Sequence, residues 1–266
     1  MSELVIAGLT LRIGRSQILD GIDLVAPPGQ VTGLAGESGS GKTMTGMTVC
    51  GLQPKGAVVG GSITFGGTEL VGMRARELNR LRGAQIAMVF QDPTASLHPL
   101  LSIGGQLTDH MRHHLHLSAR DARARARDLL DQVRVPDPAG ALDRYPHQFS
   151  GGQLQRIAIA SALACEPTLL IADEPTTALD VTVQAGILRL LRQLCDDLGI
   201  GVVLVTHDLG VMSALADTIA VMRAGKVVEH GSRYDVIRNP QHPYTQHLIS
   251  SLPGHQPVAT GGEGER

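Results

Sequence analysis

The chain has 266 residues, a hydrophobic fraction of 42% and a formal net charge of −2 at pH 7. This length and apolar content are enough to bury one substantial core, with a smaller lobe appended to it. The balanced charge argues against a nucleic-acid-binding surface, and the three widely separated cysteines form no C-x-x-C pair that would indicate a zinc or iron–sulfur site.

The first third of the chain predicts short strands broken by turns, and then a first helix. Expected strands cover residues 4–6, 9–13, 22–25, 31–34, 62–65 and 86–90, with a helix over 42–52. The N-terminus lacks the basic start and long apolar run of a signal peptide. The sequence also contains no run of about 18 consecutive apolar residues, the length needed to cross a membrane. If the protein serves transport, another chain must therefore form the pore.

Strand signals disappear between Asp92 and Phe149, which predicts a helical insertion. Within it, residues 118–133 are rich in Ala, Arg, Asp and Leu, with Ser118 as the expected N-cap. After Ser150, helices and strands alternate over 153–165, 168–172, 181–197, 202–206, 209–215 and 218–222. This alternation predicts an α/β fold with a parallel sheet and helices on its faces.

Residues 36–43 read GESGSGKT and match the phosphate-loop pattern G-x-x-x-x-G-K-[ST] in full. The match follows an apolar strand and opens a helix, which is the required context. Glycines let backbone N–H groups curl around a phosphate, Lys42 can place a cation on the β- and γ-phosphates, and the Thr43 hydroxyl can bind Mg²⁺. An ordinary glycine-rich turn is the alternative. The predicted ATP-binding residues of this loop are Gly36, Glu37, Ser38, Gly39, Ser40, Gly41, Lys42 and Thr43.

Two carboxylates, Asp173 and Glu174, follow the apolar strand Leu169–Ala172. Ligands of a parallel sheet gather at the carboxyl ends of its strands. We therefore expect Asp173 to hold Mg²⁺ and Glu174 to polarise the water that attacks the γ-phosphate. The alternative, that the two acids only open a surface loop before Pro175, loses weight because a phosphate loop is present.

Between these motifs, residues 149–156 read FSGGQLQR and resemble the LSGGQ signature of ABC ATPases, with Phe149 in place of leucine. The resemblance implies a P-loop NTPase with a RecA-like core, an N-terminal antiparallel β subdomain and a helical signature subdomain. A helix N-terminus is an anion site, and this one has no lysine. It is expected to cap an ATP molecule held by the phosphate loop of a second, head-to-tail subunit. The residues involved are Ser150, Gly151, Gly152 and Gln153.

The resemblance assigns four further positions. Gln91 looks like the Q-loop glutamine, which senses Mg²⁺ and contacts the membrane partner, and Asp180 ends a TALD stretch that resembles the D-loop. His207 follows an apolar strand and looks like the switch histidine that contacts the γ-phosphate, although a lone histidine is more often structural. Ile13 stands where many ABC ATPases stack an aromatic residue on adenine, so only modest nucleotide affinity is expected.

Three stretches resemble the importers of dipeptides, oligopeptides and nickel: QDPTASLHP at 91–99, ADEPTTALDVTVQAGI at 172–187, and HPYT at 242–245. This implies an ATP-hydrolysing subunit that uses ATP and Mg²⁺ on the cytoplasmic face of the inner membrane. Its implied partners are two permease subunits, a second and usually different ATPase subunit (a heterodimer, with a homodimer as the alternative) and, indirectly, an extracytoplasmic substrate-binding protein. The expected ATPase domain is 1–252, with the helical subdomain about 92–150 inserted, and 253–266 form a flexible tail.

Other interpretations remain open at this point. No cysteine follows Cys195, so the iron–sulfur extension of many peptide-importer ATPases is not expected, and the short end leans toward nickel or another metal chelate. A soluble ABC ATPase acting on nucleic acid or ribosomes, and a regulatory subunit that no longer hydrolyses ATP, are the competing functions. Of the histidines at 110, 113, 114 and 116, three could share a helix face at i, i+3 and i+4 and bind a metal, or the helix could simply be solvated.

Overall fold

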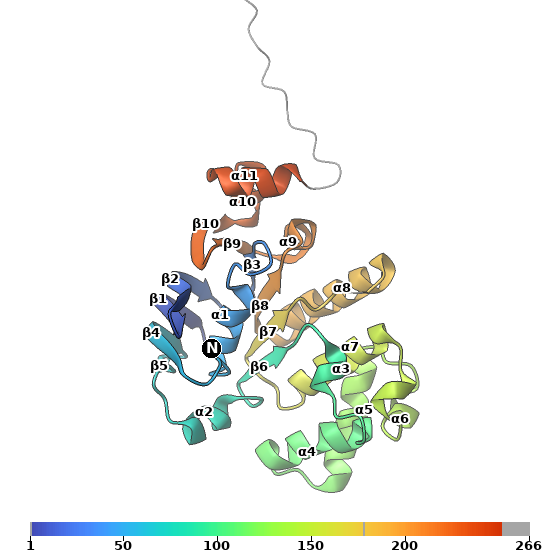
Figure 1. Ribbon diagram of the computed structural model, residues 1–266. Helices are drawn as coiled ribbons and strands as arrows, with labels where there is room; N and C mark the ends of the chain where they lie inside the picture. Colours follow the sequence, from blue (N-terminus) through green and yellow to red (C-terminus); the bar gives the residue numbers. More distant parts are fainter. Residues whose placement is uncertain (1, 178, 252–266) are drawn as a thin grey trace, which may run out of the picture.

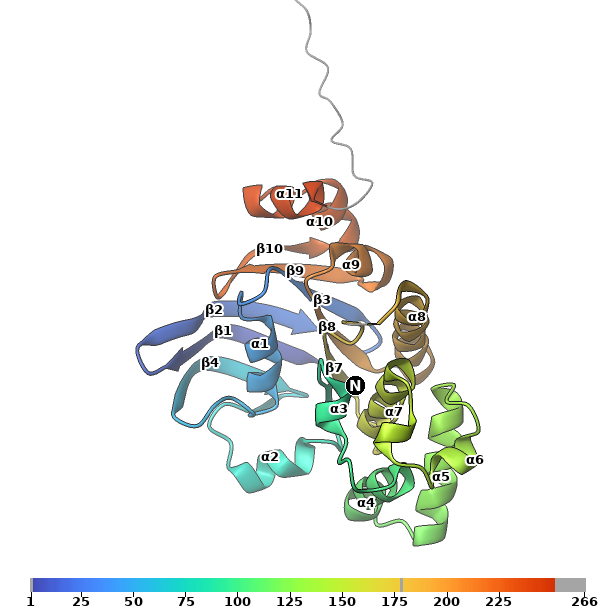
Figure 2. The same cartoon turned by 45° about the vertical axis from the view of Figure 1, so that its right-hand side comes forward.

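The computed structural model describes residues 2–177 and 179–251, and the tail expected at 253–266 lies outside them. Within these residues the strands form two sheets (Figures 1 and 2). The smaller sheet is antiparallel and has the strand order β2-β1-β4-β5. Its strands are β1 (Leu4–Ile13), β2 (Ser16–Ala26), β4 (Ala57–Phe65) and β5 (Thr68–Glu69). This sheet is the antiparallel β subdomain that the resemblance implied.

The structure corrects the strands expected at 4–6, 9–13 and 62–65, because glycines lie inside the observed strands rather than between or before them. Strand β1 runs through Gly8, and β4 runs through Gly60 and Gly61. Gly8 has φ +55° and Gly61 has φ +84°, and the pairing of β1 with β4 shifts register between Ala7 and Thr10. A Cβ on Gly61 would overlap the Gly8 carbonyl oxygen. The glycines therefore form a bulge inside continuous strands rather than ending them.

The larger sheet has six strands in the order β10-β9-β3-β8-β7-β6. They are β3 (Val31–Ala35), β6 (Ile86–Val89), β7 (Leu169–Asp173), β8 (Gly201–Thr206), β9 (Thr218–Arg223) and β10 (Lys226–Ser232). All neighbours from β9 to β6 are parallel, which confirms the predicted parallel sheet. The edge strand β10 pairs antiparallel with β9 and was not anticipated.

Two hydrophobic clusters cover the two faces of the larger sheet. In β7, Leu169 and Ile171 face the cluster shared with the antiparallel sheet and helix α1 (Lys42–Val49), whereas Leu170 and Ala172 face the cluster shared with helices. Both sets are buried, as expected for a parallel strand covered on both sides. The covering helices include α7 (Gly151–Leu163), α8 (Val181–Leu198) and α9 (Leu209–Leu215).

Helices occupy the segment between β6 and α7, at the end of the molecule away from β10 (Figure 1). They are α3 (Pro93–Ser96), α4 (Ile103–Leu115), α5 (Ala119–Gln132), α6 (Pro138–Ala141) and the 3₁₀ turn Pro146–Gln148. The Ser118 hydroxyl accepts a hydrogen bond from Asp121 N at 3.1 Å, so α5 begins where its predicted N-cap placed it.

Three short helices were not anticipated: α2 (Ala75–Leu81), α10 (Arg233–Arg238) and α11 (Pro243–Ser250). Figure 2 shows α10 and α11 stacked beside β9 and β10, at the end opposite to α4. Over the described part of the chain, every helix falls short of the length and apolar character needed to cross a bilayer.

Candidate functional site

A cavity of about 740 Å³ lies where the carboxyl ends of β3, β7 and β8 meet. The sequence-predicted residues that line it are Ile13, Gly36, Glu37, Ser38, Gly39, Gly41, Lys42, Thr43, Gln91, Glu174 and His207. Residues separated by more than 190 positions thus meet at one place. Helix α1 begins at the cavity, so its N-terminal partial positive charge points toward a bound anion.

The phosphate loop joins β3 to α1 through backbone angles that require glycine. Gly36 has φ +146° and Gly41 has φ +108°. A Cβ on Gly36 would overlap the carbonyl oxygen of Met222 on the neighbouring strand, and a Cβ on Gly41 would lie 2.7 Å from a Leu19 methyl carbon. The loop is therefore wedged between β9 and β2, which fixes the direction of its N–H groups. Ser40 belongs to the loop but does not line the cavity, and its side chain is buried.

Lys42 is the cation of the cavity. Its Nζ donates to the carbonyl oxygens of Gly36 at 2.7 Å and Glu37 at 2.8 Å, and the residue is 6% exposed. An ammonium group has three donors, so these two bonds hold the side chain across the loop with one donor remaining for a phosphate oxygen. Burial lowers the pKa of Lys42 from its ordinary value, and the nearby carboxylates of Glu174 and Asp173 oppose that change.

Thr43 and Asp173 meet at the floor of the site. The Thr43 hydroxyl donates to Asp173 Oδ1 at 3.0 Å, and Asp173 is 3% exposed. Burial raises the pKa of Asp173, while the Thr43 hydrogen bond and the Lys42 charge act in the other direction. A hydroxyl and a buried carboxylate side by side are the hard oxygen ligands that Mg²⁺ takes together with phosphate oxygens, so this pair fits the predicted metal.

Glu174 and His207 form a hydrogen-bonded pair at the edge of the cavity. Glu174 Oε1 lies 2.7 Å from His207 Nδ1 and accepts from His207 N at 3.0 Å, while Oε2 accepts from the Thr177 hydroxyl at 3.0 Å. The Glu174 side chain is 13% exposed and that of His207 is 61% exposed. Glu174 also has φ +47°, a conformation that non-glycine residues adopt at a cost. The Thr206 hydroxyl also donates to Oε2 at 3.3 Å, so four contacts hold the carboxylate in one orientation.

The large apolar side chains that line the cavity are Ile13, Ile18, Met44 and Leu248. Only Ile13 was predicted from the sequence. Ile18 and Met44 could not be predicted from the sequence, because both are ordinary apolar residues that belong to no motif. Leu248 follows the HPYT stretch, which marked a family branch rather than a binding residue.

A tyrosine at position 13 is expected to tighten ATP binding, because an aromatic ring would stack on the base where isoleucine can only pack. Stacking on an aromatic side chain contributes about 1–3 kcal/mol in nucleic-acid systems, which corresponds to a fall in the dissociation constant of about 5- to 150-fold. Isothermal titration of Ile13→Tyr with ADP measures it. An unchanged dissociation constant would show that the base lies elsewhere.

The signature residues lie apart from this cavity. Ser150 caps α7 by accepting from Gln153 N at 3.4 Å, and Gln153 Oε1 accepts from Ser150 N at 3.0 Å. Gly151 and Gly152 already belong to the first turn of α7, two residues earlier than the predicted helix start at 153. Asp180 caps α8 by accepting from Val183 N at 3.0 Å. The structure thus brings the phosphate-loop residues together and leaves the signature residues and Asp180 outside the cavity.

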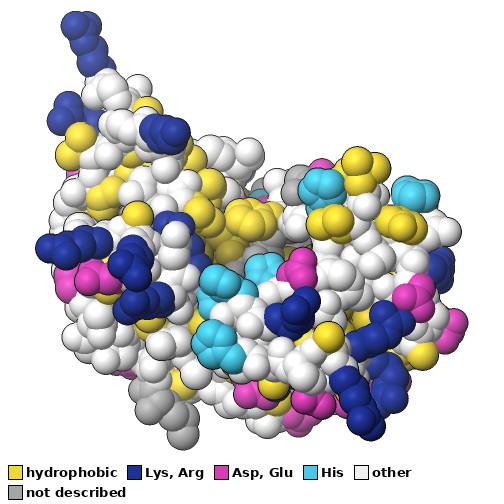
Figure 3. All heavy atoms as spheres, turned by 90° about the horizontal axis from the view of Figure 1, so that it is seen from below, with side chains coloured by type: hydrophobic (Ala, Val, Ile, Leu, Met, Phe, Trp, Pro, Cys, Tyr) yellow, Lys and Arg dark blue, Asp and Glu magenta, His cyan; other side chains and the backbone are white. Residues whose placement is uncertain are grey.

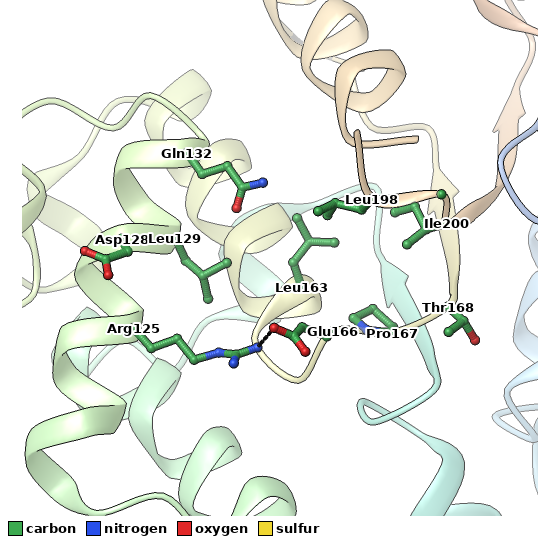
Figure 4. A pocket seen from close by; sticks show the side chains of 11 residues that line it. Arg125, Asp128, Leu129, Gln132, Leu163, Glu166, Pro167, Thr168, Leu198 and Ile200 are labelled. Carbon is green, nitrogen blue, oxygen red and sulfur yellow. Dashed lines mark ion pairs between the residues drawn. The ribbon is translucent and has the colours of Figure 1, made fainter. Parts of the chain in front are cut away.

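A second cavity, of about 420 Å³, lies at the opposite edge of the sheet (Figure 4). Leu129, Leu163 and Leu198 point into it, and an Arg125–Glu166 ion pair of 2.8 Å spans helix α5 and the residues after α7. It adjoins the amino ends of β7 and β8 and contains none of the predicted site residues. Its position, away from the carboxyl ends of the strands, separates it from the phosphate-binding chemistry.

Histidine side chains gather beside a hollow on the face seen in Figure 3, and helix α4 carries His110, His113 and His114. The rings of His110 and His114 stack with centroids 6.4 Å apart, and His113 meets His114 edge-on at 4.8 Å. Burial, together with the other two histidines, lowers the pKa of His114. Nowhere in the described ranges do three or more His, Cys, Asp or Glu side chains converge on a point that could hold an ion.

The comparison with known proteins agrees with this geometry. Residues 19–177 match a family described as ABC transporter, and residues 228–265 match one described as the C-terminal region of oligopeptide and dipeptide transporters. A probable D,D-dipeptide transport ATP-binding protein of Escherichia coli is 46% identical over 91% of this chain and 74% of its own length. A dipeptide transport ATP-binding protein of Bacillus subtilis is 46% identical over 90% of this chain and 72% of its own.

Solved structures with a similar fold also come from ABC transporters. A dimeric ATP-binding cassette in a post-hydrolysis state, bound to ADP and Pi, superposes with a TM-score of 0.75 at 30% identity, covering 88% of this chain and 99% of that one. CbiO1 of Clostridium perfringens, part of an ABC transporter complex, superposes with a TM-score of 0.76 at 27% identity, covering 89% and 90%. The chain therefore belongs to the ATP-hydrolysing subunits of ABC transporters, in the dipeptide and oligopeptide import family.

Proposed function

We propose that this protein hydrolyses ATP to power the uptake of peptides through separate membrane permease subunits. The observation that carries the proposal is the convergence of Lys42, Thr43–Asp173 and Glu174–His207 on one cavity at the carboxyl edge of the sheet. The cargo is proposed to be peptides because relatives that match most of the chain are named for dipeptide or oligopeptide transport.

Each side chain has a defined task in the proposed reaction. Lys42 and the N–H groups of residues 36–43 bind the β- and γ-phosphates, and Glu174 accepts a proton from the attacking water. His207 positions the Glu174 carboxylate through Nδ1 and lies close enough to the cavity to contact the γ-phosphate. Thr43, Asp173 and Gln91 would hold Mg²⁺, which neutralises phosphate charge when bound.

The residues of the signature act on a second subunit in this proposal. Ser150, Gly151, Gly152 and Gln153 present a helix N-terminus on a different lobe from the phosphate loop, where one ATP cannot touch both within a chain. Asp180 lies in the adjoining loop at the start of α8. A head-to-tail dimer brings these groups onto the partner's ATP, and a different ATPase chain is the expected partner.

The remaining assignments follow from membership of an importer. We place the protein at the cytoplasmic face of the inner membrane, bound to two permease subunits, with an extracytoplasmic binding protein delivering the cargo. The ATPase domain is proposed to span 1–252, with 92–150 as its helical subdomain. The names of the relatives favour a peptide cargo over nickel. A nucleic-acid or ribosomal role has no comparable support.

Uptake of a labelled dipeptide and of labelled nickel in the native cell separates the two cargoes. Lys42→Ala is expected to abolish dipeptide uptake and leave nickel uptake intact, because only ATP binding by this subunit is removed. Lys55→Ala changes an exposed lysine outside the cavity and serves as the matched control. Loss of nickel uptake alone would reassign the protein to a metal importer.

A further inference from the structure

The HPYT stretch forms the start of helix α11 and fixes where that helix sits. His242 caps the helix, its Nδ1 accepting from Tyr244 N at 3.1 Å, and Pro243 occupies the first helical position. The Glu229 carboxylate on β10 accepts from Gln241 N at 2.7 Å and from His242 N at 3.1 Å. Helix α11 is therefore attached to the edge of the main sheet at its first turn.

Tyr244 extends from this helix to the phosphate loop. Its hydroxyl accepts a hydrogen bond from Glu37 N at 3.1 Å, and the residue is 5% exposed. The Arg223 guanidinium lies over its ring, 4.8 Å from the centroid. A buried tyrosine keeps its hydroxyl bonded, and here the partner is a backbone group of the loop that binds phosphate.

The Glu37 residue is held on both sides. Its N–H donates to Tyr244, and its C=O accepts from Lys42 Nζ at 2.8 Å. Tyr244 and Lys42 therefore both bond to the backbone of Glu37. This residue links the C-terminal helix to the lysine of the site.

Leu248 lies one helical turn beyond Tyr244, on the same face of α11. It is one of the apolar residues that line the cavity, as Ile13 and Ile18 are. The face of α11 that carries Tyr244 and Leu248 therefore meets the phosphate loop at Tyr244 and the cavity at Leu248.

We propose that helix α11 is a structural part of the ATP site: Tyr244 positions the phosphate loop, and Leu248 packs against the nucleoside end of the bound nucleotide. This inference rests on the proposed function in that nucleotide is taken to occupy the cavity. It gives the HPYT stretch a physical role in nucleotide binding.

ADP and pyrophosphate, each with Mg²⁺, separate the two roles, because pyrophosphate has no nucleoside. Tyr244→Phe keeps the buried ring and removes the hydroxyl, so affinity for both ligands should fall by a similar factor, about five- to tenfold, through the unsatisfied N–H of the loop. Leu248→Ala removes apolar contact, so affinity for ADP should fall about tenfold while affinity for pyrophosphate stays unchanged. Leu248→Met should restore ADP binding.

Two matched variants control for the chemistry of the changes. Tyr234 is a 58%-exposed tyrosine also under an arginine, and Leu198 is 49% exposed at the second cavity. Tyr234→Phe and Leu198→Ala should bind both ligands as wild type does. Wild-type affinities in both α11 variants, or loss of ADP but not pyrophosphate binding in Tyr244→Phe, would overturn the inference. A wild-type protein that binds neither ligand would instead refute the proposed function.

Discussion

Glu174→Gln is expected to slow ATP hydrolysis by about 100- to 10,000-fold while ATP binding is retained. The amide has nearly the same shape as the carboxylate, but it cannot take a proton from the attacking water. Binding should survive because the phosphate loop is held by other groups, among them Lys42 and the glycine contacts with β9. Phosphate release under saturating ATP, together with the dissociation constant for ATP, measures both effects.

Glu77→Gln is the matched control, since Glu77 is an exposed glutamate in the first turn of α2. It should leave hydrolysis unchanged. Wild-type phosphate release in Glu174→Gln would mean that another group accepts the proton. A loss of ATP binding would mean that Glu174 has a structural role through its bonds to His207 and Thr177.

Lys42→Ala should lower kcat/KM for ATP by about 100- to 1,000-fold, the usual effect of removing one group that stabilises developing charge. Here the loss has two sources, since the side chain supplies a cation and also bonds the loop carbonyls of Gly36 and Glu37. Lys42→Arg should recover little of the activity, because a planar guanidinium cannot reproduce those two bonds in a space that leaves the residue 6% exposed.

Steady-state hydrolysis of Lys42→Ala, compared with Lys55→Ala, provides the measurement. A circular dichroism spectrum shows whether the sheet is intact. Normal activity in the Lys42→Ala protein would refute the assignment of residues 36–43 as the phosphate loop.

The parts of the site that sequence could predict are those that chemistry restricts to a few residue types. Gly36, Gly39 and Gly41 could be predicted because each has a positive φ, which favours glycine. Gly36 also approaches the Met222 carbonyl too closely for a Cβ. Asp173 and Glu174 could be predicted because two carboxylates at the carboxyl end of an apolar strand, in a chain with a phosphate loop, suit a Mg²⁺ ligand and a general base. The alternation of helices and strands after Ser150 also predicted the parallel sheet, whose strands β7, β8 and β9 are buried along most of their length.

The parts that could not be predicted depend on contacts between distant segments. Gly8 and Gly61 have the appearance of strand ends, and only their mutual approach shows that they form a bulge. Leu248 and Ile18 are ordinary apolar residues until the fold places them at one cavity. The short helix α11 has no long apolar period, and its location depends on Glu229 and Tyr244.

The order of the strands has a consequence for synthesis of the protein on the ribosome. Strand β3, which leads into the phosphate loop, has β8 and β9 as its neighbours, and Glu37 bonds to a tyrosine 207 residues further along the chain. A nascent chain that has emerged only to the end of α7 therefore has a complete phosphate-loop sequence but lacks the strands that hold it. Such long-range pairing makes folding slow and late. ATP should accordingly give no protection from proteolysis to ribosome-bound chains until nearly the whole polypeptide has emerged.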